Sequence, residues 1–280
     1  MAYRRISLLL DQDRLCEART RVAIGLAQRF DAHLFGIAPT GLLEVPISVE
    51  GAASLSDYAE RARSAFAARA HANVHAFAAL CGREDFDRFE TVVDIGDKGQ
   101  LLVRHAQCSD LLLLSQPEPG SAGQREHAAL VDHVVLGSAR PTLVLPHHEQ
   151  GLQLVGSRVL VAWDESREAS RALADALPLL QAAEQVEVVH WNPSHADSHG
   201  LDERLAELRQ WLVLHRVRSD VRIEHTDIGI AETLLSHAAD LDADLVVMGA
   251  YSRGPWAERV LGGVTRKLLA SMTVPVLLSH

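Results

Sequence analysis

An apolar segment at residues 244–249 stops at Gly249 and leads, through a loop with small residues, into a helical pattern that opens at Gly262 and Gly263. A strand, a glycine-containing loop and a helix N-terminus in this order direct unpaired backbone N–H groups at one place. The helix macrodipole adds about half a positive charge there. The segment therefore predicts an anion site whose natural occupant is a phosphate, or the remnant of such a site if the loop has decayed.

A second candidate is Asp164, which ends another short apolar segment. In open α/β sheets ligands bind at the carboxyl ends of the strands, so an acid at this point is placed to meet a ligand. The same carboxylate precedes a helical pattern at residues 167–181 and suits a helix N-cap. The two interpretations are compatible, and the sequence leaves both open.

Other patterns give little support to catalysis. The chain contains no GxxxxGK[ST] loop, no GxGxxG after the first strand, and no recognisable Ser-His-Asp arrangement. His71 and His75 are four residues apart on a predicted helix, a spacing that can hold a metal, but no third ligand of matching type is evident. We therefore predict no catalytic residue and no metal site, with a weak ATPase as an open alternative.

Composition limits the class of protein. A chain of 280 residues with 48% hydrophobic content suits two α/β cores, and its net charge of −10 argues against nucleic acid and acidic membranes as partners. Cys16, Cys81 and Cys108 share no CxxC spacing, which indicates a reducing cytoplasm, and we expect Cys108 to be a small core residue. No apolar run approaches the length of a transmembrane helix, and the N-terminal run is too short for a signal peptide.

The two halves of the sequence repeat each other. Residues 3–13 match 157–166, residues 92–115 match 225–249, and both halves finish with a strand after a proline, Pro141 or Pro275. Near-continuous Val/Leu strands that alternate with helices predict parallel sheets covered on both faces. We expect domains at residues 1–150 and 151–280, joined by a linker at 147–157 that few contacts cross.

This duplication predicts how the halves pack. Two fused copies of one domain usually replace a homodimer, so we expect a pseudo-dimer within the chain, and a further homodimer is possible. The last strands, residues 141–146 and 275–280, are the expected contact, because an apolar edge strand left open promotes aggregation.

These motifs resemble the universal stress protein family in its tandem, two-domain form. The resemblance is strong over residues 157–280 and weaker over 1–146. It implies two flavodoxin-like or Rossmann-like domains, each a five-stranded parallel sheet, and ATP or AMP as the ligand, with Mg possible beside ATP. The matching positions imply nucleotide contacts at Ala162, Asp164, Trp191, Met248, Gly249, Ser252, Arg253, Gly254, Gly262, Gly263, Val264 and Thr265.

The C-terminal loop departs from the family pattern at two of these positions. Ser252 stands where a glycine is expected and Gly263 where a hydroxyl is expected, although Gly254 and Thr265 lie nearby. One lost hydrogen bond to a charged oxygen costs roughly 1.5–3 kcal/mol, which weakens binding without abolishing it. Arg253 can return some charge to the phosphates.

The N-terminal half has lost every glycine of the loop. A gapless alignment places Ser115, Glu118, Ala128 and Ala129 at the positions of Gly249, Ser252, Gly262 and Gly263. Glu118 would repel a phosphate. We therefore predict a cytoplasmic stress regulator or sensor that binds one adenine nucleotide, in its C-terminal domain; the alternatives are a nucleotide-free interaction scaffold and a slow ATPase.

Overall fold

The computed structural model of the chain describes residues 2–41, 52–148, 152, 155–193, 200–251 and 263–280. In this article the N-terminal half means strands β1 to β5 with their helices, and the C-terminal half means β6 to β10 with theirs. The elements of the N-terminal half are β1 (Arg5–Leu9), α1 (Cys16–Phe30), β2 (His33–Pro39), α2 (Ala52–Arg83), β3 (Phe89–Asp94), α3 (Lys98–Ala106), β4 (Leu111–Ser115), α4 (Gln124–Gly137) and β5 (Thr142–Leu145). Those of the C-terminal half are β6 (Arg158–Ala162), α5 (Arg167–Asp175), α6 (Leu177–Ala182), β7 (Gln185–Pro193), α7 (Leu201–Leu214), β8 (Asp220–Thr226), α8 (Ile230–Asp240), β9 (Leu245–Gly249), α9 (Gly263–Ser271) and β10 (Val276–Ser279).

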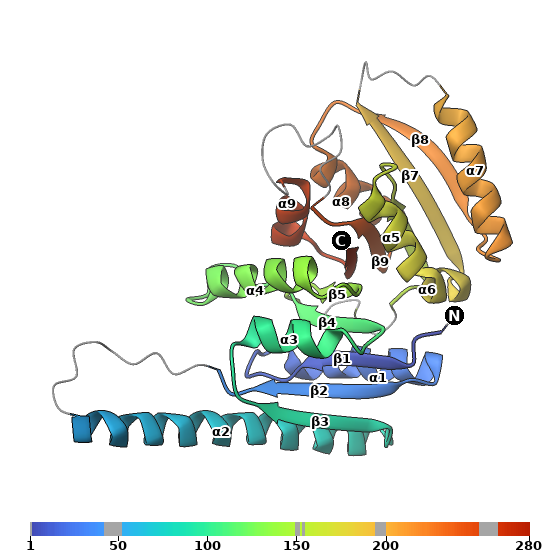
Figure 1. Cartoon of the computed structure of the whole chain (residues 1–280). Coiled ribbons are helices and arrows are strands. Elements are labelled where there is room, and N and C mark those ends of the chain that lie inside the picture. Colours follow the sequence, from blue (N-terminus) through green and yellow to red (C-terminus); the bar gives the residue numbers. More distant parts are fainter. Residues whose placement is uncertain (1, 42–51, 149–151, 153–154, 194–199, 252–262) are drawn as a thin grey trace.

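One sheet of ten strands runs through both halves (Figure 1), in the order β3-β2-β1-β4-β5-β10-β9-β6-β7-β8. Within each half every pair of neighbouring strands is parallel, and the order 3-2-1-4-5 is the Rossmann-like one of the doubly wound orders. The predicted α/β class, with two repeated five-stranded parallel sheets, is confirmed.

The halves meet through their last strands. β5 and β10 pair in antiparallel register, with Val276 opposite Val144 and Leu278 opposite Thr142. Among the described strands of the sheet, all other neighbouring pairs are parallel. Pairing the two apolar edges satisfies backbone groups that each half alone would leave open. The predicted contact between the last strands is therefore confirmed.

Helices cover both faces of the sheet, and each face has its own apolar core. One face carries α1, α2, α5, α6 and α7, with buried side chains such as Val22 and Leu205. The other carries α3, α4, α8 and α9, with Val134 and Leu268. Side chains that alternate along each strand divide between the two cores, as the pleat requires.

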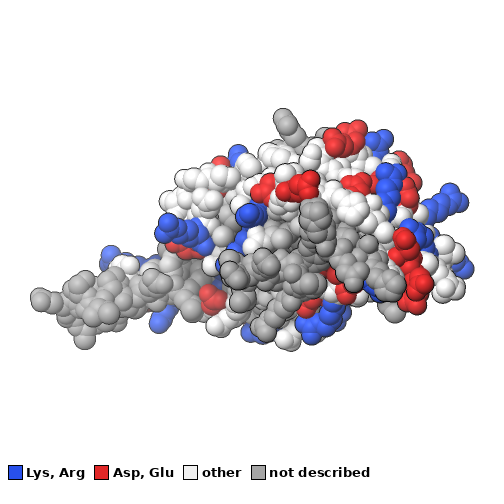
Figure 2. Space-filling view, turned by 90° about the horizontal axis from the view of Figure 1, so that it is seen from above, with Lys and Arg blue, Asp and Glu red and all other residues white. Residues whose placement is uncertain are grey.

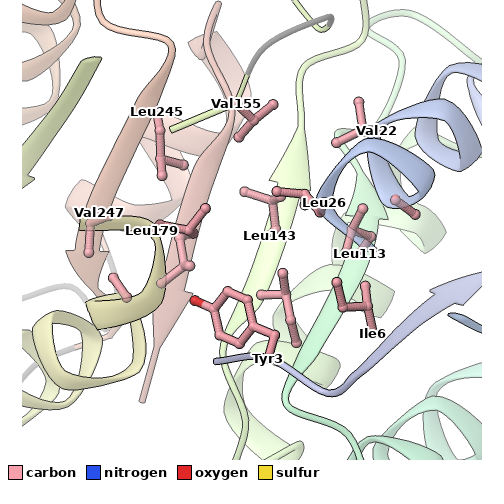
Figure 3. Packing of buried hydrophobic residues seen from close by; sticks show 14 of the residues in the cluster. Tyr3, Ile6, Val22, Leu26, Leu113, Leu143, Val155, Leu179, Leu245 and Val247 are labelled. Carbon is pink, nitrogen blue, oxygen red and sulfur yellow. The ribbon is translucent and has the colours of Figure 1, made fainter. Parts of the chain in front are cut away.

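The first of these cores is continuous across the two halves (Figure 3). Ile6 and Leu143 of the N-terminal half belong to the same buried cluster as Leu179 and Leu245 of the C-terminal half. The Tyr3 hydroxyl also crosses between the halves, donating to the carbonyl oxygen of Asp175 at 2.8 Å. The two repeats therefore share one buried apolar core on this face and do not pack as separate domains there.

The expected linker with few contacts is wrong for the residues described there. Leu152 and Val155 are buried in the shared core. The Arg29 guanidinium donates to the carbonyl oxygens of Val155 at 3.0 Å, Gly156 at 3.2 Å and Ala182 at 2.6 Å. Apolar residues in this polar stretch explain the difference, because they bury beside the core that both halves build.

Two smaller expectations have mixed outcomes. Among the described residues no helix is both long and apolar enough to cross a membrane. Cys81 is buried, but Cys108 is exposed, so the prediction that Cys108 is a core residue is wrong. Cys108 follows the end of α3 in the turn before β4, where its side chain has no core to enter.

Candidate functional site

The C-terminal half brings several predicted residues to one edge of the sheet. β6 and β9 are neighbours, with Ala162 opposite Met248, so the residues that follow both strands lie at the same carboxyl edge. Asp164 comes two residues after β6, and Gly249 ends β9. This is the edge at which open α/β sheets bind ligands. Ser252, Arg253, Gly254 and Gly262 lie outside the described residues.

Gly249 is required by the packing of the neighbouring helix. A Cβ at this position would lie 2.5 Å from the backbone nitrogen of Ala169 and 2.6 Å from the carbonyl carbon of Glu168, both at the start of α5. Those distances are far inside van der Waals contact, so only glycine lets α5 approach β9 this closely. The glycine that the sequence assigns to phosphate approach therefore has a packing role that sequence reasoning missed.

The start of α9 leaves room around its first glycine. A Cβ on Gly263 would meet no atom of the described residues within 4 Å, and Val264 beside it is partly buried. Thr265 is buried, and its Oγ1 accepts a hydrogen bond from the backbone nitrogen of Tyr251 at 3.1 Å. The Thr265 hydroxyl thus holds the backbone of Tyr251, the second residue after β9.

Asp164 shapes the turn between β6 and α5. Its Oδ1 accepts from the backbone nitrogen of Ser166 at 3.0 Å, and Ser166 is the N-cap of α5, accepting from the nitrogen of Ala169 at 3.0 Å. The cap of α5 is thus Ser166, and Asp164 forms an Asx-type turn just before it. Glu165 between them has a left-handed backbone, with φ of 62°.

Trp191 lies in the core. Its side chain is 4% exposed and packs in the same cluster as Met248, with its ring edge-to-face against His237 at 5.8 Å between centroids. The indole nitrogen has no hydrogen-bond partner among the described residues. His190, on the opposite face of β7, is also buried, and burial lowers its pKa.

The N-terminal half places a buried guanidinium at the corresponding edge. Arg19 of α1 is 0% exposed and donates to the carbonyl oxygen of Leu9 at 2.7 and 3.1 Å, to Ser115 Oγ at 2.5 Å and to Asp11 Oδ1 at 2.8 Å. Burial opposes ionisation of Asp11, but the adjacent guanidinium outweighs it and lowers the pKa of that carboxyl.

This network replaces the close packing of the other half. The shift of 153 residues that aligns Asp11 with Asp164 (164 − 11) places Ala172 at the position of Arg19 (19 + 153), as Gly249 stands at the position of Ser115. Ala172 and Gly249 let α5 settle on the sheet, whereas Arg19 and Ser115 fill the same junction with hydrogen-bonded polar groups. Because the two substitutions compensate each other in space, sequence periodicity alone could not link them.

Two further features complete this edge of the N-terminal half. Glu118, predicted to repel a phosphate, forms an ion pair with Arg14 at 3.2 Å. Helix α4 begins at Gln124, before Ala128 and Ala129, so the N–H groups of these alanines lie inside the helix and bond to carbonyls one turn earlier. The amides that would face a phosphate in this half are therefore already used.

A charged group on the outer strands of the C-terminal half was also missed. Atoms of Glu187, Glu224 and His237 lie within 4.8 Å of one another, and this is the metal-capable group of three among the described residues. His237 bridges the two carboxylates at 2.7 and 3.3 Å, and Arg222 approaches Glu187 at 3.6 Å. The arrangement is an ion-pair network that ties α8 to β7 and β8. His71 and His75 are exposed on α2 and do not join it.

Charges of both signs are interspersed on the surface. In the view of Figure 2, acidic and basic side chains alternate over the described part of the face, without a continuous basic area there. A continuous basic surface is what nonspecific binding to nucleic acid requires.

Comparisons with known proteins agree with this architecture. The family model of the universal stress protein family matches residues 157–280. A universal stress protein from Archaeoglobus fulgidus DSM 4304 has the same fold, with a TM-score of 0.66 and 17% identity over 98% of this chain and 95% of that one. A functionally unknown protein from Pseudomonas aeruginosa PAO1 gives a TM-score of 0.58 and 17% identity over 99% and 92%. The comparison with curated proteins gives no match.

The family match and the fold point the same way. The matched residues cover β6 to β10, and β1 to β5 repeat their strand order. Residues 157–280 thus match the universal stress protein family, and the N-terminal half repeats the strand order of the matched half.

Proposed function

We propose that the C-terminal half binds one adenine nucleotide, ATP or AMP, and that the N-terminal half binds none. The protein then acts in the cytoplasm as a stress-response regulator or sensor through its conformation and its choice of partners. Domains at residues 1–150 and 151–280 would divide the two roles.

One observation carries this proposal, the different use of backbone amides in the two halves. In the N-terminal half α4 already encloses Ala128 and Ala129, and Arg19 and Ser115 fill the strand ends. In the C-terminal half α9 is described from Gly263 onward, and a Cβ on Gly263 would meet no atom of the described residues within 4 Å. A helix N-terminus beside the carboxyl ends of parallel strands favours an anion.

The adenine part of the proposal rests on the sequence resemblance. The strand ends at Ala162, Asp164 and Trp191 hold the positions that, by that resemblance, meet the nucleoside, and the structure brings Ala162 and Met248 side by side. Trp191 would contribute its backbone, because its ring is buried.

We expect Gly263→Asp to abolish binding of ATP and AMP, because a carboxylate at the start of α9 would repel the phosphates. An acid at this position favours the helix itself, so the fold should persist. Isothermal titration calorimetry measures the affinity, and circular dichroism checks the fold.

The matched control is Ala129→Asp, the same change at the equivalent position of the N-terminal half. It should leave the affinity of the wild-type protein unchanged. Loss of binding in Ala129→Asp, or wild-type affinity in folded Gly263→Asp, would refute the assignment of the site to the C-terminal half.

A further inference from the structure

Asp132 of the N-terminal half holds two residues of the C-terminal half. Its Oδ1 accepts a hydrogen bond from the Tyr251 hydroxyl, and its Oδ2 accepts from Arg266 Nε at 3.1 Å. Tyr251 follows β9 and Arg266 lies in α9, so the two partners flank, in the chain, the segment that the proposed nucleotide site requires. One carboxylate from α4 therefore binds both the residue that follows Ala250 and a residue of α9.

The pair Asp132–Arg266 joins equivalent positions of the two repeats. The shift that aligns Ser115 with Gly249 is 134 residues (249 − 115), and the same shift takes Asp132 to position 266. Two identical copies around a twofold axis would bring like charges together here, which is unfavourable. The attractive pair exists because the two copies differ, so this contact is specific to the fused chain.

Tyr251 adopts a backbone conformation that needs support. Its φ is 56°, in the left-handed region, which is uncommon for a bulky residue. Its backbone nitrogen donates to Thr265 Oγ1, and its hydroxyl donates to Asp132. Strained residues of this kind persist only where the surroundings fix them, and they cluster at functional sites.

The buried hydrogen bond from Tyr251 to Asp132 should contribute more to stability than the exposed ion pair between Arg266 and Asp132. The side chains of Asp132 and Arg266 are 22% and 61% exposed and line a groove of about 330 Å³ between α4 and α9, so salt and water weaken their ion pair. Tyr251 is buried, and burial, with the Asp132 carboxylate, raises the pKa of its hydroxyl. The hydroxyl therefore stays protonated and donates to Asp132 throughout the physiological range.

We propose that Asp132 is a positioning residue for the nucleotide site of the other half. By fixing Tyr251 after β9 and Arg266 in α9, it holds the described start of α9 against the end of β9 before the ligand arrives, and this preorganisation raises affinity. The N-terminal half, which binds no nucleotide itself, thereby acts as a built-in partner that controls the affinity of the C-terminal half. This inference rests on the function proposed above.

The test compares three substitutions by calorimetry with ATP. Asp132→Ala loses both bonds and should weaken binding about tenfold or more, Asp132→Asn keeps an acceptor for Tyr251 and should weaken it less, and Tyr251→Phe should resemble Asp132→Ala. The double variant Asp132→Ala/Tyr251→Phe should be no weaker than Asp132→Ala alone, because both changes remove the same bond. Glu126→Gln, which removes an exposed acid from the same helix, is the control and should bind as the wild type does.

Hydrogen exchange separates this inference from the proposed function. In Asp132→Ala without nucleotide, the backbone amide of Tyr251 should exchange faster than in the wild type, while Glu126→Gln leaves it unchanged. If the wild type binds ATP and Asp132→Ala binds it equally well, the inference is overturned. If the wild type binds no nucleotide, the proposed function fails, and unchanged exchange at Tyr251 would overturn the positioning role as well.

Discussion

Replacing Arg19 with Met should lower the free energy of unfolding by about 3–5 kcal/mol, the range for breaking a buried ion pair from one side. The methionine fills part of the space but leaves the Asp11 carboxylate, the Leu9 carbonyl and the Ser115 hydroxyl without their donor. Urea denaturation followed by circular dichroism gives the value. Arg21→Met is the matched control, because Arg21 lies on the same helix in half-exposed ion pairs whose loss should cost about 0–1 kcal/mol.

The Arg19 effect should depend on pH in a defined direction. Because the folded pKa of Asp11 is lowered, the ion pair contributes stability that is fully present above the ordinary Asp pKa of about 3.9 and is lost as pH falls through the lower folded pKa. The difference in free energy of unfolding between the wild type and Arg19→Met should therefore become smaller as the pH falls into the acid range. The double variant Arg19→Ala/Ser115→Gly imitates Ala172 and Gly249 and should recover part of the lost free energy of unfolding. An Arg19→Met variant as stable as the wild type would contradict a stabilising role for the buried ion pair.

The second large effect is expected at Gly249. Gly249→Ala places a methyl group 2.5 Å from the backbone nitrogen of Ala169 and 2.6 Å from the carbonyl carbon of Glu168. Both are backbone atoms and cannot move aside as a flexible side chain can. We expect a loss of about 3 kcal/mol in the free energy of unfolding, the upper part of the range for overpacked sites. Thermal and urea denaturation measure it.

A glycine with free space provides the comparison for Gly249. Gly25 lies inside α1, and a Cβ there would meet no atom within 4 Å in the part of the chain that the structure describes. Gly25→Ala should stabilise the protein slightly, because alanine has a higher helix propensity than glycine by about 1 kcal/mol. Equal effects at the two positions would show that α5 can move away from β9 at little cost.

The repeat made the fold predictable. Apolar strands that alternate with helices twice over, each half closing on a proline-led strand, are sufficient to predict two parallel sheets. The contact through β5 and β10 followed from their apolar edges, and the structure confirms it. The fold could be predicted in this way because hydrophobic periodicity and turn residues are read within short stretches of sequence.

The site was less predictable because its decisive contacts are long-range. Gly249 fits a phosphate loop by sequence, yet its tightest neighbours are in α5, about eighty positions earlier in the chain. Arg19 belongs to an unremarkable helical pattern, and nothing in its spacing indicates a buried network with Ser115. Asp132 and Tyr251 come together only when the halves assemble. Ser252, Arg253, Gly254 and Gly262, which carry much of the resemblance to a nucleotide loop, remain predictions.

The two halves should differ in nucleotide binding, with one nucleotide in the C-terminal half and none in the N-terminal half. Native mass spectrometry of the full chain, titrated with ATP and separately with AMP, counts the bound molecules directly. We expect one nucleotide per chain at saturation, retained in Ala129→Asp and lost in Gly263→Asp. Two nucleotides per chain, or none at concentrations well above cellular ATP, would contradict it.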